Sequence, residues 1–190
     1  GKTHEAPHLT NLQGDSFDIQ HPGVHELLRI PEGPGDNLIL EGKVTPVGGA
    51  KCAKRLYFTR MILSGSWLHP VNSLELYSSG YHFDSRDAVG LRVDRSANMS
   101  ISEFMGRMPS HTIRLAELHP EKAETRYGHA DILIANMTIG PVKLNIGWAH
   151  TWSPLFNWMW LEVPDIPWGQ QVGGLLGRAD FGPASSRPED

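Results

Sequence analysis

The sequence predicts an all-β domain with mainly antiparallel strands, and three observations support this prediction. First, 20 Gly and 14 Pro are spread along the whole 190-residue chain and are not gathered in one linker. Second, the segments between them are short runs rich in β-branched and aromatic residues, recurring at spacings of about 8–12 residues. Third, helical periodicity is scarce. We therefore expect a β-sandwich or an orthogonally packed β-structure, with long loops and at most one short helix.

The expected strands after the N-terminal region are alternating or apolar runs bounded by Gly, Pro, Ser, Asn or Asp. A turn at Ser78–Gly80 and a turn at Gly140-Pro141 would each join two of them. The best candidate for a short helix is Ser100–Met108. Ser153–Trp160 is expected to be the most exposed part of the Trp-rich stretch, because a Pro interrupts this segment and no periodicity organises it. The expected strands are Leu38–Val44, Arg55–Leu63, Leu74–Tyr77, Tyr81–Phe83, Ala88–Val93, His111–Leu118, His129–Ile139 and Val142–Trp148.

Composition and charge exclude several classes of protein. Hydrophobic residues make up 39% of the chain, which is enough for one domain with its own core rather than a disordered segment. The 17 Lys+Arg against 21 Asp+Glu give a formal charge of -4, which argues against a nucleic-acid partner. The single cysteine, Cys52, excludes an internal disulfide and a thiolate zinc site. The apolar runs are far shorter than the roughly 20 residues of a membrane helix, so no membrane span is expected.

No motif in the sequence predicts catalysis, a cofactor or a metal. His21 and His25 are four residues apart, but a Pro-Gly pair separates them, so they cannot share a helix face as zinc ligands would. There is no HExxH, no GxSxG and no Walker motif. Asn98 and Asn136 each begin an Asn-x-Ser/Thr pattern, which is an N-glycosylation acceptor only in the secretory pathway. Asn136 lies inside a strongly strand-like segment, which makes it the poorer acceptor.

Five of the six Trp residues are concentrated between residues 148 and 168. One interpretation is a corner of the core where a long loop wraps back on the sheet, because Trp rings bury much area and anchor irregular segments. The other is an exposed patch that docks a partner, since aromatic residues dominate interface energetics. Under the second interpretation, the candidate partner-binding residues are Trp152, Phe156, Trp158 and Trp160.

Both ends of the chain carry a family-like pattern. Pro7–Pro31 reads PHLTNLQGDSFDIQHPGVHELLRIP, and Gln171–Asp180 reads QVGGLLGRAD. The first stretch resembles the opening of a von Willebrand factor type D domain, and the second resembles its closing segment. The resemblance implies a β-sandwich of that type. It also implies a single domain over residues 1–190, in which 7–31 are the opening strands and 171–190 are the closing segment and tail.

The chain departs from that family's pattern at its cysteines and at its calcium site. The positions where the family carries cysteines hold His25, Gly173 and Leu176, so the disulfide framework is lost as a set. An Arg follows Gly177 where an oxygen ligand of calcium is expected. Asp180 is left as the single candidate metal ligand, and we expect no metal to bind by the family's mechanism.

The resemblance implies a non-enzymatic structural or interaction module that mediates protein–protein assembly outside the cytosol, either secreted or in an organelle lumen. A second hypothesis is an extrinsic subunit on the lumenal or outer face of a large membrane complex, for example a photosystem. A third is a hydrolase whose Asp and His residues converge only in three dimensions. The first hypothesis requires no cofactor and one or more protein partners.

Overall fold

A computed structural model of the chain describes residues 7–46, 56–78, 89–95, 98–99, 113–115, 121–125, 128–151, 158–165, 171–177 and 186–187. Nearly all of the regular structure in these ranges is strand, together with the short 3-10 helices η2 (Ser66–Leu68) and η4 (Leu175–Gly177). The strands are β1 His8–Thr10, β2 Ser16–Asp18, β3 Gly23–Ile30, β4 Leu38–Pro46, β5 Leu56–Ser64, β6 Ser73–Ser78, β7 Val89–Val93, β8 Asn98–Met99, β9 Ile113–Leu115, β10 Glu121–Thr125, β11 Gly128–Ile139, β12 Val142–Thr151, β13 Trp158–Asp165 and β14 Ser186–Arg187.

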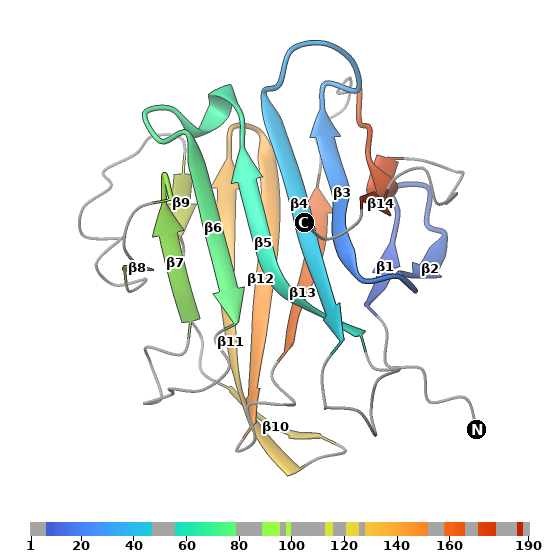
Figure 1. Cartoon of the computed structure of the whole chain (residues 1–190), viewed down its shortest axis with the longest axis vertical. Coiled ribbons are helices and arrows are strands. Elements are labelled where there is room, and N and C mark those ends of the chain that lie inside the picture. The colour runs from blue at the N-terminus through green and yellow to red at the C-terminus, as the bar shows by residue number, and fades with distance from the viewer. Residues whose placement is uncertain are drawn as a thin grey trace.

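The strands form one small hairpin and one large branched sheet, and every described pair is antiparallel. The large sheet runs β10-β11-β12-β13-β5-β4-β3-β14, with β6, β7 and β8 continuing from β5 and with β9 beside β11. Strand β5 is the branch point, because Phe58 pairs with β13 whereas Arg60–Ser64 pair with β6. Figure 1 shows the result as two layers, with β4, β5 and β6 in front of β11, β12 and β13. The all-β, antiparallel prediction is confirmed.

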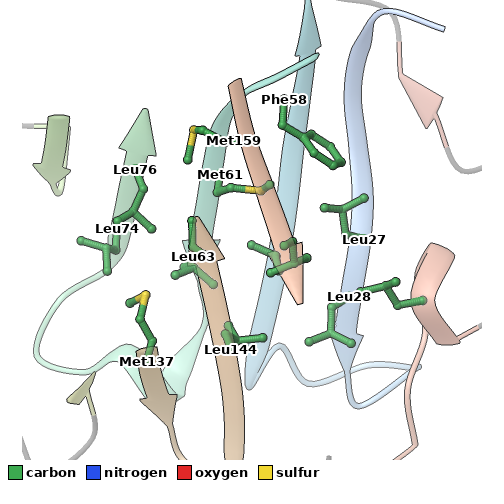
Figure 2. Close-up of a cluster of buried hydrophobic side chains, with 14 of the residues drawn as sticks. Leu27, Leu28, Phe58, Met61, Leu63, Leu74, Leu76, Met137, Leu144 and Met159 are labelled. Atoms are coloured by element: carbon green, nitrogen blue, oxygen red, sulfur yellow. The ribbon is translucent and has the colours of Figure 1, made fainter. Parts of the chain in front are cut away.

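The core lies between these two layers. Alternation along each strand sends every second side chain inward, and these positions hold large apolar residues that are almost completely buried. Figure 2 shows Leu63, Leu74 and Leu76 of the front layer opposite Met137 and Leu144 of the rear layer. Because no disulfide is possible with one cysteine, burial of this apolar surface is the main source of stability.

Most expected strands are present, with bounds shifted by one to three residues, and Gly140-Pro141 forms the turn between β11 and β12. Gly140 has a φ of 54°, as the first residue of a two-residue hairpin loop requires. His111–Leu118 is shortened to β9, and β10 was not expected because its sequence, EKAET, is polar. The expected strand Tyr81–Phe83 and the expected helix Ser100–Met108 lie outside the described residues.

Strand β13 was not among the expected strands, and its first residues, Trp158–Trp160, end the segment Ser153–Trp160 that was expected to be exposed. Met159 and Leu161 are buried, whereas Trp160 between them is only half-buried. A Trp on the outward position of a strand hides the alternation of polar and apolar residues that normally reveals a strand. Burial in β13 therefore alternates with a two-residue period, although the amino-acid sequence of this strand does not show that alternation.

The two ends of the chain meet in space. Arg29 and Gly173 exchange both backbone hydrogen bonds, at 3.0 and 2.8 Å, and the amide of Leu12 donates to the carbonyl of Leu176 at 2.9 Å. Gly174, with a φ of 81°, lies against the backbone of Leu27. The segment 171–177 is thus held on β3 and on the turn after β1, so the N-terminal and C-terminal described segments form one structural unit.

Candidate functional site

The outer face of β11, β12 and β13 carries an aromatic residue beside a row of polar side chains. Its inward counterparts Ala135, Leu144, Ile146, Met159 and Leu161 are all buried in the core. Alternation therefore places the intervening residues on the opposite side of the sheet. We call this surface the Trp160 face, and it consists of Ile134, Asn136, Asn145, Gly147, Trp160 and Glu162.

Trp160 lies across Gly147, its cross-strand partner in β12. A Cβ atom on Gly147 would stand 2.1 Å from Cε2, 2.2 Å from Cζ2 and 2.6 Å from Cδ2 of the indole. The ring therefore occupies the space that any other side chain at this position would fill. This contact holds the indole in place against the sheet, because an aromatic ring over a strand glycine buries backbone that would otherwise be exposed.

A polar row runs next to this aromatic contact. Asn145 pairs directly with Asn136 on one side and with Glu162 on the other. A β-bulge between this pair and the next fixes the position of Glu162, since β13 carries an extra residue there. Within the described part of the chain, none of these three side chains takes part in a hydrogen bond or ion pair. Their donors and acceptors are therefore available to a ligand.

The Trp-rich segment divides between core and surface. Trp148 points inward, is only 3% exposed and belongs to the hydrophobic core, whereas Trp160 lies on the outer face. Among the described residues, the buried indole N–H of Trp148 has no hydrogen-bond partner, which is a desolvation cost that the packing of the ring has to offset. The core interpretation therefore holds for Trp148, whereas Trp160 lies on the outer face and its part in docking a partner stays a prediction.

For the remaining predicted site residues, the structure describes only part of their surroundings. Trp158 is the first residue of β13 and pairs with Ala149. Trp152, Phe156 and the candidate metal ligand Asp180 lie outside the described residues. The sequence reasoning did not single out Gly147, Asn145 or Glu162 as companions of Trp160. An isolated Gly within the strand-like run VKLNIGW was the available signal, because such a glycine often marks a close approach.

His8 and Asp18 come together across the β1–β2 hairpin, as the hydrolase hypothesis would need. Their Nδ1 and Oδ1 atoms are 2.6 Å apart, and the hydroxyls of Thr10 and Ser16 are 3.1 Å apart on the same hairpin. The side chains of His8 and Asp18 are 67% and 38% exposed. Water screens such a pair, so the contact favours hairpin pairing weakly and lacks the desolvation that activates a catalytic His–Asp pair.

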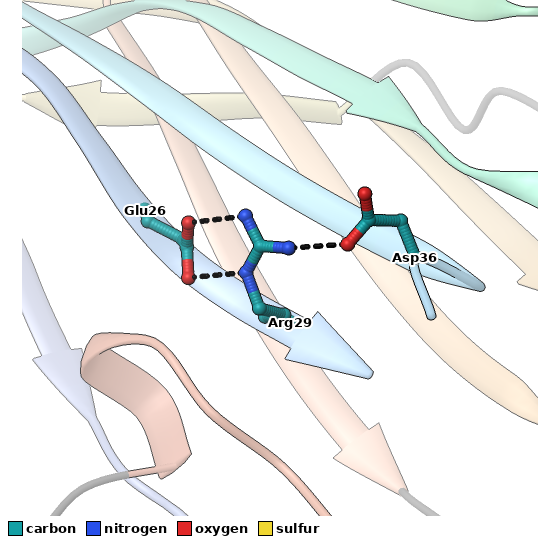
Figure 3. A network of polar contacts seen from close by, with 3 residues as sticks. All are labelled: Glu26, Arg29 and Asp36. Atoms are coloured by element: carbon teal, nitrogen blue, oxygen red, sulfur yellow. Dashed lines mark hydrogen bonds and ion pairs between the residues drawn. The ribbon is translucent and has the colours of Figure 1, made fainter. Parts of the chain in front are cut away.

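Arg29 forms the most extensive polar network on the front layer (Figure 3). Its Nε and Nη2 donate to the two carboxylate oxygens of Glu26, each at 2.9 Å, and its Nη1 donates to Asp36. The hydrogen bond to Glu26 raises the pKa of Arg29 above its usual value, and Asp36 adds to this effect. Three of its nitrogens are therefore already engaged, and the network joins β3 to the β3–β4 loop instead of presenting a cation to a ligand.

His25 is the buried titratable residue of β3 and stands where the resembled family has a cysteine. Its side chain is 3% exposed, and Nε2 lies 2.8 Å from the carbonyl oxygen of His21, to which it donates. Burial lowers the pKa of His25, the hydrogen bond to His21 partly offsets this, and repulsion from the His21 ring lowers it further. The imidazole is therefore a neutral part of the packing.

In the described ranges, no group of three or more His, Cys, Asp or Glu residues is close enough together to hold a metal ion. No helix in those ranges is long and apolar enough to cross a membrane. Comparison with models of known protein families and with curated proteins finds no match for the chain.

Proposed function

We propose that this domain is a non-enzymatic interaction module that assembles with a protein partner outside the cytosol. The observation that carries the proposal is the Trp160 face, where a half-buried indole lies over Gly147 beside three polar side chains that make no hydrogen bond to any described residue. Trp is enriched among the residues that dominate binding energy, and polar groups around it supply specificity.

The fixed position of Trp160 favours binding energetically. An indole held against a glycine has already lost most of its rotational freedom, so little further entropy is lost when a partner covers it. The supporting strands β11, β12 and β13 are part of the main sheet, so the contact surface lies on a rigid element.

The resemblance to von Willebrand factor type D domains supports the same proposal and gives the expected compartment. The residues that carry the resemblance lie at the two ends of the chain, and the closing segment is hydrogen-bonded to the opening strands through Arg29 and Leu12. Such domains act in adhesion and assembly, which is why we propose a secreted or lumenal location.

The test is association with the native partner. The tagged full chain would be used to isolate the partner from its native source, and affinity would then be measured with the purified partner. Trp160→Ala is expected to weaken association at least about tenfold while the far-UV circular dichroism spectrum stays that of a folded β-protein.

Trp67→Ala provides the matched control. Trp67 of η2 also covers a glycine, Gly140, with ring atoms 3.0–3.4 Å from the position of a Cβ there, but it packs against the core. Trp67→Ala should lower stability and leave association unchanged. Equal loss of association in both variants would indicate that Trp160 supports the fold and not the interface, and the proposal would fail.

A further inference from the structure

We infer that the group received by the Trp160 face is a neutral saccharide carried by the partner protein. This inference rests on the proposed function, because it assigns the chemistry of the same surface. It follows from the arrangement of two adjacent rows, one apolar and one polar, on an antiparallel sheet.

The apolar row fits one face of a sugar ring. It consists of Ile134, Gly147 and Trp160, in register across the three strands. A pyranose ring in its chair form has C–H groups on its faces and hydroxyls at its rim. Its C–H face can lie on an indole, whose π-system attracts the slightly positive hydrogens and whose area excludes water. The absence of a side chain at Gly147 leaves the space over this residue to the indole of Trp160.

The polar row fits the hydroxyl rim. Asn136 and Asn145 each offer an amide donor and an acceptor, and Glu162 adds a second type of acceptor. Directly paired residues in such a sheet are about 5 Å apart, and successive rows are about 7 Å apart. These spacings are similar to the width of one sugar unit, so a ring on Trp160 brings its hydroxyls within reach of the polar row.

Other occupants fit this chemistry less well. As a charged group, the polar row itself offers an anion such as a phosphate only the carboxylate of Glu162, and the outward cation of β12, Lys143, lies two residues beyond Asn145. The apolar side chains of a peptide segment would cover Asn136 and Asn145 without supplying partners, and buried amides without partners are destabilising. A ligand with many hydroxyls and no charge satisfies both rows.

Asn136 also begins a glycosylation acceptor pattern, so a glycan on this chain is a second source of the same chemistry. We assign the Trp160 face to a glycan on the partner. The full chain made in bacteria carries no N-glycan, which separates the two sources.

The experiment is calorimetric titration of this bacterial protein with four neutral hexasaccharides, built from glucose, N-acetylglucosamine, mannose and galactose. At least one is expected to bind. Trp160→Ala should lower that affinity about tenfold or more, and Asn145→Ala about threefold or more, since the latter removes one pair of hydrogen-bonding groups from an outer position. Trp67→Ala should bind as the unaltered chain does.

Several results would overturn the inference. The inference is wrong if none of the four hexasaccharides binds at millimolar concentration, or if binding survives Trp160→Ala in a folded protein. Trp160 could be shielded from solvent only in protein made by a secretory host, with the shielding lost in Asn136→Gln. That result would assign the surface to the chain's own glycan. If association with the partner requires Trp160 but persists after enzymatic removal of the partner's glycans, this inference fails while the proposed function stands. If association does not require Trp160, both fail.

Discussion

Replacing Gly174 by Ala is expected to release the closing segment 171–177 from β3. Gly174 has a φ of 81°, which L-residues with a side chain rarely adopt. A Cβ there would also stand 2.8 Å from the carbonyl carbon and oxygen of Leu27 and from the amide nitrogen of Leu28. These are backbone atoms in a paired strand, so they cannot rotate away as a side chain would, and the closing segment has to move instead.

The expected loss of stability can be worked out from two contributions. The left-handed backbone conformation destabilises Ala by about 1 kcal/mol. Movement of the segment also exposes Leu175 and Leu176, which are now 5% and 3% exposed. Exposure of one leucine costs about 2 kcal/mol, so Gly174→Ala should lower the free energy of unfolding by about 3 kcal/mol, or about 5 kcal/mol if both leave the core.

Two other glycines separate these contributions. Gly14 also has a positive φ, 90°, but no atom lies within 4 Å of its Cβ position, so Gly14→Ala should lose only about 1 kcal/mol. Gly33 has neither a positive φ nor a neighbour within 4 Å, so Gly33→Ala should be neutral or stabilising by about 0.5 kcal/mol. Urea denaturation at equilibrium measures all three variants.

Hydrogen exchange locates the change. The amide of Arg29 donates to the carbonyl of Gly173 at 3.0 Å, so its protection should fall in Gly174→Ala and stay unchanged in Gly14→Ala. The reasoning is refuted if Gly174→Ala is no more destabilised than Gly14→Ala and the Arg29 amide keeps its protection.

The remaining predictions concern the core, the buried histidine and the Trp160 face. Leu63→Ala should lower the free energy of unfolding by about 3 kcal/mol because it leaves a cavity between the layers. Ile62→Ala, on the outer side of β5, should lower it by about 1 kcal/mol. Similar urea midpoints for the two variants would contradict the assignment of Leu63 to the core. Because the folded-state pKa of His25 is lowered, the unfolded state binds more protons, so the free energy of unfolding should fall as the pH drops below about 6.5 and level off below the folded-state pKa. That slope should shrink in His25→Gln, and an unchanged slope would assign it to other groups. Gly147→Ala should displace Trp160 and weaken partner binding as Trp160→Ala does; unaltered binding would show that the position of the ring is unimportant.

The sequence predicted the strands in which polar and apolar residues alternate. In β4, the run LILEGKV places Leu38, Leu40 and Val44 inward, and the structure buries all three. The turn at Gly140-Pro141 was equally readable, since a glycine at a positive φ followed by a proline suits a two-residue hairpin loop. By contrast, β10 and β13 were missed, because pairing with β11 and β12 determines them more strongly than their own residues do.

The candidate site was only half predictable for a related reason. Trp160 could be singled out as an aromatic anchor from sequence, but its role depends on Gly147 and Asn145, which are 13 and 15 residues away along the chain. Only the β12–β13 register brings these residues together on one face. Trp148 and Trp160 look alike in the sequence, and which of them is core follows from strand parity.

The sequence by itself determined the class of this protein: antiparallel β structure, one domain-sized core without disulfides, and no motif for known chemistry. These properties are local or compositional, so the residue types and their spacing in the sequence are enough to predict them. The tertiary structure decided which strand lies beside which, that the closing segment is held on β3, and that one Trp faces the core while another faces outward. Those outcomes depend on contacts between residues far apart in the chain, whose free energy is gained only when the two layers pack together.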